Sequence, residues 1–152
     1  MNKIFLILVT IFFISGCSYK PILTSKKNDF TLENINSDSD SKINSIIKKN
    51  LLERSSDLSK NNYDLYFSTE VEKEIVSSNE SGDSTIFKIQ ITLNYSLNQN
   101  NKIIFTNEIV KQVNYNNIDD KFELLKYEEN IMQTLLESIS SEILMSITNT
   151  FK

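Results

Sequence analysis

The central part of the chain alternates between apolar and polar residues over three long stretches. Residues 63–75, 85–97 and 103–115 each place most of their apolar side chains at odd positions and most of their polar side chains at even positions. This period of two is typical of a strand with one buried face and one wet face. The polar turns at residues 78–83 and 99–101 are short, so we predict that the three strands form an antiparallel meander.

A short strand and two helices are predicted on either side of the meander. Residues 30–35 begin with the same alternation and are expected to form a strand. Apolar residues then recur at helical spacing from Ile43 to Leu52, after the capping residues Asp40 and Ser41. A second, uninterrupted helix is expected from Lys121 to Phe151, roughly 45 Å long at 1.5 Å per residue. Its apolar stripe comprises Phe122, Leu125, Ile131 or Met132, Leu135, Leu136, Ile139, Ile143, Ile147 and Phe151.

These elements follow each other in the order β-α-β-β-β-α. The apolar face of the sheet needs a cover, and the two helices supply it. We therefore predict an α+β two-layer sandwich, in which a four-stranded, mostly antiparallel sheet is covered on one face by both helices. The long helix could instead dock a partner helix or a membrane surface, but an uncovered sheet face is not stable alone. Both uses are compatible, because further apolar residues widen the helix face: Leu124, Tyr127, Leu144 and Met145.

The first 16 residues have the layout of an export signal. Lys3 precedes an apolar run from Ile4 to Ile14, which ends at the small residues Ser15 and Gly16. The run is shorter than the roughly 20 residues that a membrane-spanning helix needs. A cleaved signal peptide is therefore favoured over a retained signal anchor.

The only cysteine of the chain, Cys17, follows this segment directly. The stretch Ile14–Cys17 resembles the lipobox of bacterial lipoproteins. That resemblance implies that the thiol carries a diacylglycerol, that the signal is cut before Cys17 and that the new amine is acylated. Several acyl chains anchor a protein firmly, because each buried CH₂ contributes about 0.8 kcal/mol. The polar stretch that follows disfavours a buried cysteine, whereas an intermolecular disulfide stays open as an alternative.

The chain divides into three parts. Residues 1–16 form the predicted lipoprotein signal peptide, residues 17–29 a lipidated tether, and residues 30–152 a single α+β domain. After cleavage 136 residues remain, with 15 basic and 20 acidic side chains and a net charge of −5. An acidic chain without a long basic run argues against a nucleic-acid partner. Ser18 is not the aspartate that commonly retains lipoproteins in the inner membrane, so the lipobox resemblance implies the periplasmic side of the outer membrane.

The sequence offers little for catalysis, cofactors or metal ions. It has no histidine, and its two glycines cannot build a phosphate-binding loop. The segment Asp38–Asp40 resembles the start of a calcium loop, but the glycine and the closing glutamate are missing, so a turn and a helix cap are favoured. The row Glu70, Glu72 and Glu74 is expected to be a solvated face rather than a cation site. We expect a protein that is not an enzyme and that has no cofactor and no metal.

The mature chain as a whole resembles the LptE family of lipopolysaccharide-assembly lipoproteins. The lipobox cysteine is followed at once by the aromatic-Lys-Pro-aliphatic segment Tyr19–Ile22, then by a strand, an amphipathic helix, a meander of long strands and a closing helix. The alphaproteobacterial branch of the family shares this order, and its last helix ends in an apolar pair spaced like Ile143 and Ile147. Ser18 and Leu23 depart from the glycine and the tyrosine that are common there.

The resemblance implies a non-catalytic role at the outer membrane. Members of the family act as a plug in the LptD β-barrel, help the barrel to assemble, and bind lipopolysaccharide (LPS) during its delivery. An anionic glycolipid calls for basic groups, and the candidates on or beside the strands are Lys73, Lys88, Lys102 and Lys111. Ordinary surface charge that keeps the protein soluble is the alternative for these lysines. Other classes stay open: a periplasmic lipid- or solute-binding lipoprotein, alone or with an ABC transporter, or a free-standing structural lipoprotein.

Overall fold

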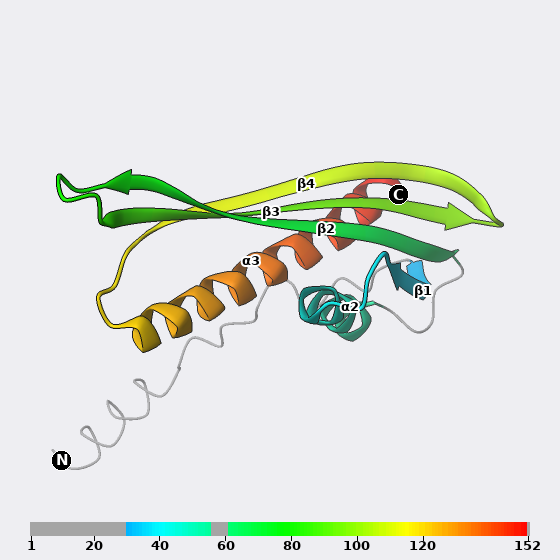
Figure 1. Ribbon diagram of the computed structural model, residues 1–152. Coiled ribbons are helices and arrows are strands. Elements are labelled where there is room, and N and C mark those ends of the chain that lie inside the picture. Colours follow the sequence, from blue (N-terminus) through cyan, green and yellow to red (C-terminus); the bar gives the residue numbers. More distant parts are fainter. Residues whose placement is uncertain (1–29, 56–60, 152) are drawn as a thin grey trace, which may run out of the picture.

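The computed structural model describes residues 30–55 and 61–151, which form one sheet and two helices (Figure 1). The elements are β1 (Phe30–Ser37), α2 (Lys42–Arg54), β2 (Asn61–Ser78), β3 (Ser84–Gln99), β4 (Lys102–Asn116) and α3 (Lys121–Thr150). This succession confirms the predicted order β-α-β-β-β-α. The predicted signal peptide and tether, with Cys17, lie outside the described residues.

The sheet has the strand order β1-β2-β3-β4 and is mixed. β2 pairs antiparallel with β3, and β3 pairs antiparallel with β4, as the predicted meander requires. β1 pairs parallel with β2, which corrects the expectation of a mostly antiparallel sheet. The helix between them is the reason, because α2 carries the chain back along the sheet, so that β2 starts at the same end as β1.

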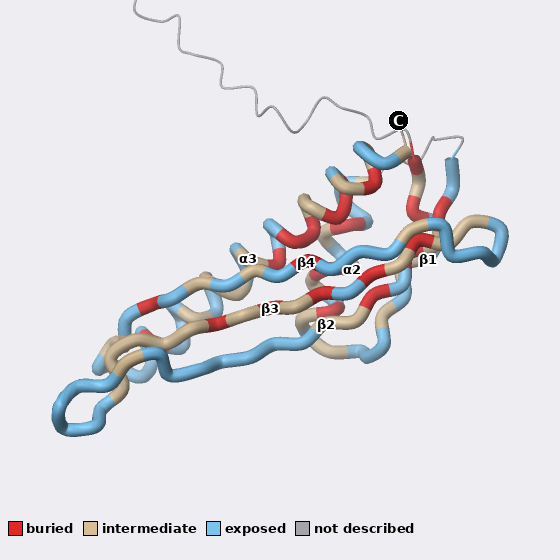
Figure 2. The backbone as a smooth tube through the Cα atoms, turned by 90° about the horizontal axis from the view of Figure 1, so that it is seen from above, coloured by how far each residue is buried: buried red, intermediate tan, exposed pale blue. Residues whose placement is uncertain are grey.

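Both helices lie on the same face of the sheet, as predicted (Figure 1). Burial is concentrated where β1, α2 and the C-terminal half of α3 meet the sheet, whereas the β2–β3 hairpin at the far end is exposed (Figure 2). The molecule therefore has a well-packed end and a thin, more exposed end. The buried apolar core consists of Phe30, Leu32, Ile47, Leu51, Tyr63, Leu65, Phe67, Ile89, Ile91, Leu93, Tyr95, Leu97, Ile109, Tyr115, Leu124, Leu136, Ile139, Ile143, Leu144 and Ile147.

Tight turns join the strands of the meander. β3 and β4 are connected by Asn100 and Asn101, whose φ angles are 51° and 60°. A two-residue hairpin with positive φ at both positions is a type I′ turn, and asparagine tolerates that conformation. The β2–β3 turn has Gly82 at φ 87°, and it closes through a hydrogen bond of 2.9 Å from the Asn79 N–H to the Asp83 carbonyl. Both turns were predicted.

Asn44 joins the β1–α2 turn to the sheet. The Ser41 side chain caps α2 by accepting a hydrogen bond of 3.1 Å from the Asn44 N–H, which confirms the predicted turn and cap in this segment. The buried Asn44 side chain donates to Asp38 Oδ1 at 3.2 Å and accepts from the Thr69 hydroxyl of β2. These bonds satisfy a polar group inside the core.

The predicted core position Ile103 is exposed instead. A bulge shifts the β3–β4 register between Leu97 and Asn98, so that Leu97 pairs with Phe105 while Asn98 already pairs with Ile103. An extra residue in one strand reverses the face of the residues beyond it. Ile103 consequently pairs with the polar residue Asn98 of β3, and its side chain does not join the core.

The predicted stripe of α3 is wrong at its N-terminal end. Phe122 and Leu125 are 72% and 62% exposed, whereas Leu124 is buried. The helix runs obliquely beneath the sheet (Figure 1). Because the sheet is twisted, the side of the helix that faces the sheet changes along the helix. At this end the side of α3 that carries Leu124 and Glu128 faces the sheet, because Glu128 accepts a hydrogen bond from Tyr115 of β4.

Candidate functional site

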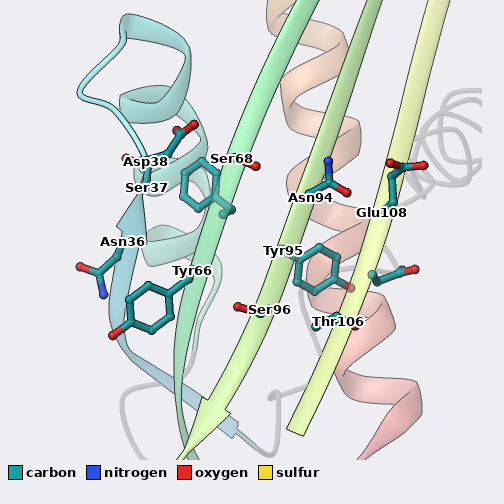
Figure 3. Close-up of a pocket in the computed structure, with 12 residues that line it drawn as sticks. Asn36, Ser37, Asp38, Tyr66, Ser68, Asn94, Tyr95, Ser96, Thr106 and Glu108 are labelled. Atoms are coloured by element: carbon teal, nitrogen blue, oxygen red, sulfur yellow. The ribbon is translucent and has the colours of Figure 1, made fainter. Parts of the chain in front are cut away.

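The uncovered outer face of the sheet contains an open depression with a volume of about 680 Å³ (Figure 3). It lies on the side of the sheet opposite the helices, where β2, β3 and β4 run side by side and the end of β1 joins them. Its lining consists of Asn36, Ser37, Asp38, Tyr66, Phe67, Ser68, Asn94, Tyr95, Ser96, Thr106, Asn107 and Glu108.

Strand register explains the shape of this depression. Two cross-strand rows of directly paired residues form its floor: Tyr66, Ser96 and Thr106 in one row, and Ser68, Asn94 and Glu108 in the other. These even positions point away from the helices, because odd neighbours such as Phe67 and Tyr95 are buried in the core. Serine, threonine and asparagine are small, so they leave a hollow beside the large ring of Tyr66 (Figure 3).

Most side chains that line the depression carry a hydroxyl or an amide group, although apolar atoms make up the larger part of its exposed lining. Its lining includes two carboxylates, Asp38 and Glu108, and no lysine or arginine. Such a surface can exchange many hydrogen bonds with another polar surface, but it cannot neutralise a phosphate group, which requires cations. The exposed ring of Tyr66 adds an aromatic face with a polar tip. The site is therefore suited to an uncharged surface that combines apolar area with hydrogen-bonding groups, and not to the anionic part of a lipid.

The four lysines predicted to bind LPS do not gather at this depression. Lys73 on β2 and Lys111 on β4 interrupt the apolar positions of their strands, and both point toward the helix layer. Lys73 Nζ lies 2.6 Å from Glu128 Oε1, and Lys111 forms an ion pair with Glu142. Both carboxylates belong to α3, so these two lysines fasten the long helix to the sheet.

The other two lysines lie at separate places. Lys88 is on the outer face, where it lies directly opposite Glu74 and forms an ion pair of 3.0 Å with it. Lys102 begins β4 beside the tight turn, roughly 30 Å along the strand from Lys111 at 3.3 Å per residue. Among residues 30–55 and 61–151, no ion pair involves Lys102. The four residues thus occupy two faces and both ends of the sheet, and their role in LPS binding stays a prediction.

A polar cluster around Glu128 was not anticipated from the sequence. Glu128 Oε1 accepts a hydrogen bond of 2.7 Å from the Tyr115 hydroxyl as well as the bond from Lys73. The Lys73 ammonium also lies 4.8 Å from the centre of the Phe87 ring, which is a cation–π distance. Burial, the hydrogen bond to Glu128 and the negative charge of Glu128 together raise the pKa of Tyr115 well above its usual range.

The acidic row of β2 is a solvated face, as predicted. Glu70, Glu72 and Glu74 are all exposed and lie on the same outer face as the depression. Among the residues that the structure describes, Glu72 accepts a single long side-chain hydrogen bond of 3.5 Å, from Gln90. Within the described part of the chain, neither helix is both long and apolar enough to cross a bilayer.

Comparison with known proteins shows which solved structures share this fold. No family model matches the chain, and no curated protein matches its sequence. Solved structures do match. The fold is shared with bacterial lipoproteins. The rare lipoprotein B of Shewanella oneidensis superposes with a TM-score of 0.61 at 13% identity, over 77% of this chain and 93% of that one.

Two further solved structures give the same result. Lipoprotein B of Nitrosomonas europaea has a TM-score of 0.61 at 16% identity and matches 80% of this chain and 86% of its own. A minor lipoprotein of Acinetobacter baumannii has a TM-score of 0.61 at 9% identity and matches 81% of this chain and 92% of its own. At these identities the likeness concerns the fold, which is preserved over nearly the whole length of the three proteins.

Proposed function

We propose that this chain is an outer-membrane lipoprotein that assists LPS transport and assembly as the plug or partner of an LptD-type β-barrel. Acyl chains on Cys17 would anchor it on the periplasmic side of the membrane. The observation that carries the proposal is the agreement of two separate properties of the chain. One is the lipobox-like segment that ends at Cys17, and the other is a domain whose fold matches solved lipoproteins from several bacteria.

The two faces of the sandwich suit a plug. The lumen of a membrane β-barrel is polar. Residues along its strands alternate between facing the lipid and facing the lumen, and those that face the lumen are polar. The outer face of the sheet offers matching hydroxyl and amide groups around Ser96 and Asn94. The opposite face is packed under two helices, and the ion pairs of Lys73 and Lys111 fasten α3 to it. A domain with one covered face and one open face that presents hydroxyl and amide groups can fill a polar lumen.

Lys102 is the best placed of the four lysines for an LPS phosphate. The other three hold carboxylates of the protein itself, and an anionic ligand would have to displace those carboxylates. Lys102 lies at an exposed turn at one end of the sheet and belongs to no ion pair within the described ranges. LPS contact is therefore proposed at the β3–β4 turn rather than in the depression, which carries only negative charge.

A periplasmic lipid- or solute-binding lipoprotein, alone or with an ABC transporter, is the second candidate function. Such a protein needs an enclosed apolar pocket for its ligand. The depression on the outer face is open rather than enclosed, and the space between the layers is filled by core residues such as Ile91, Leu93 and Leu136. The geometry therefore supports the plug over the binding protein.

Affinity purification from native membranes tests the proposal. The full-length protein with a C-terminal tag would be extracted in mild detergent from outer membranes and captured. A plug is expected to bring down one large β-barrel in equal molar amount, together with LPS. A protein that travels alone, or that brings down the subunits of an ABC transporter, would refute the proposal in favour of the second candidate.

A further inference from the structure

The edge of the sheet at β2 is only partly covered. β1 pairs with β2 from Phe30 and Asn61 as far as Ser37 and Phe67, and the chain then leaves the sheet to enter α2. β2 itself continues to Ser78. Within the described residues, no strand pairs with this second part of β2 on the side where β1 ends. We call the stretch Thr69–Ile75 the open β2 edge.

The direction of the free backbone groups follows from one hydrogen bond. The Asp38 N–H donates to the Phe67 carbonyl at 3.1 Å, so the backbone groups of Phe67 point toward the β1 side. In a strand, the N–H and C=O of one residue point to the same side, and successive residues alternate. The backbone groups of Val71, Lys73 and Ile75 therefore point outward. Those of the even residues between them point toward β3 and are used in its ladder.

The side chains along the open β2 edge are also uncovered. Val71 and Ile75 occupy predicted core positions, but they are 37% and 61% exposed because α2 covers only the other half of β2. On the opposite face, Glu70, Glu72 and Glu74 form an exposed acidic row with one carboxylate every second residue. Lys73 does not balance this row, since it is held beneath the sheet by Glu128. Lys88 of β3 pairs with Glu74, so Glu70 and Glu72 are the carboxylates of the row that form no ion pair within the described residues.

These features decide which strand would fit. A second copy of the chain is disfavoured, because any antiparallel pairing in which two acidic rows overlap sets glutamates opposite each other. A strand with basic residues at every second position would instead meet Glu70 and Glu72 directly, while its alternate apolar residues would cover Val71 and Ile75. The backbone would supply affinity and the charges would supply selectivity, as in other cases of strand addition to a sheet edge.

We propose that the open β2 edge is a docking site for an extended segment of a partner protein in which basic and apolar residues alternate. The segment would continue the line of β1 and add its backbone to the outward groups of Val71, Lys73 and Ile75. This inference goes beyond the proposed function and does not depend on it, because the recognition chemistry is the same whatever protein carries the segment.

A designed peptide tests the proposal without any barrel or LPS. The probe is a labelled synthetic peptide of about seven residues, a usual strand length, in which lysine alternates with valine. It would be titrated into the full-length protein in detergent, and a peptide with glutamate in place of lysine is the control. We expect saturable binding of the lysine peptide only, and new protection from hydrogen exchange at the amides of Val71, Lys73 and Ile75. Binding without protection at these amides would overturn the proposal.

Matched variants separate edge docking from general charge attraction. Glu70→Lys/Glu72→Lys is expected to weaken binding at least about tenfold, because close charge pairs govern such contacts. Glu80→Lys/Glu137→Lys changes the net charge equally at exposed sites away from the open β2 edge, and it should bind like the unchanged protein. Equal losses in both variants would mean unspecific attraction and would contradict the proposal. Val71→Pro, which removes one outward N–H and leaves the β3 ladder intact, should also weaken binding.

Discussion

At the residue scale, Glu128 shows how one carboxylate can hold the thin end of the molecule together. It accepts bonds from Lys73 of β2 and from Tyr115 of β4, and its side chain is only 16% exposed. The neighbouring Glu129 also forms an ion pair, with Lys42 of α2, but both of those side chains are mostly exposed. Burial therefore distinguishes two adjacent glutamates that are chemically identical.

We expect Glu128→Ala to lower the free energy of unfolding by about 2 kcal/mol, since it removes hydrogen bonds to a charged group in a shielded place. Glu129→Ala is the matched control and should change it by less than about 0.5 kcal/mol, as is usual for an exposed ion pair. Urea denaturation of the two variants checks this. Equal losses of stability in the two variants would show that the bonds of Glu128 to Lys73 and Tyr115 stabilise the fold no more than an exposed ion pair does.

Tyr115 gives the cluster a predictable response to alkali. Burial and Glu128 raise the pKa of Tyr115 in the folded state, whereas an unfolded tyrosine releases its proton near about 10. The unfolded state therefore binds fewer protons above that pH, and stability must fall as pH rises further. We expect Tyr115→Phe to lose less stability than the unchanged protein between about pH 10 and 12. Parallel urea-denaturation series at several pH values measure this, and identical slopes would contradict it.

The residues whose roles could not be predicted from the sequence are polar residues that form hydrogen bonds in or beside the core. Asn44 and Glu128 each satisfy several partners, but the chain is so rich in asparagine and the last helix so rich in glutamate that neither residue differs visibly from its neighbours. Lys73 did carry a signal, because it breaks the alternation of an otherwise regular strand. A lysine at an inward position requires a carboxylate on the covering layer, and only the fold reveals that Glu128 lies there.

At the scale of elements, periodicity predicted all six described elements and their order, because alternation and helical spacing are local properties of the chain. It could not predict how far each helix covers the sheet. Phe122 and Leu125 of α3 share the phase of the buried stripe, yet the twisted sheet lies on another side of the helix there. The parallel pairing of β1 was missed for a similar reason, since pairing partners are not written in the alternation of one strand.

The two ends of α3 should respond differently to the same substitution. Leu136 is fully buried, and Leu136→Ala is expected to cost about 3 kcal/mol of stability, as is typical for a cavity in a well-packed core. Leu125→Ala removes an exposed side chain and should change stability by less than about 0.5 kcal/mol. Thermal or urea denaturation of both variants checks the assignment. A large loss for Leu125→Ala would show that this end of α3 is buried in the protein.

At the scale of the whole molecule, the proposed function combines an anchor with a two-faced body. Cys17 supplies the anchor and lies outside the described residues, so the fold does not test it. Cys17→Ser removes the thiol that would be acylated, and without acyl chains the main attraction to the bilayer is lost. We expect the unchanged protein to incorporate labelled palmitate and this variant to incorporate none, as followed by gel autoradiography. Labelled palmitate on the variant would contradict a lipid anchor at this residue.

The central claim is that the uncovered face of the sheet lies against the wall of an outer-membrane barrel, and site-specific photo-crosslinking in living cells tests it most directly. A photoreactive residue would be placed at Ser96, in the outer depression, and in a parallel strain at Ser138, on the exposed side of α3. The account predicts a crosslink from Ser96 to a single large β-barrel protein, stronger than any crosslink from Ser138. Absence of a barrel adduct at Ser96, or an equal adduct from Ser138, would contradict it.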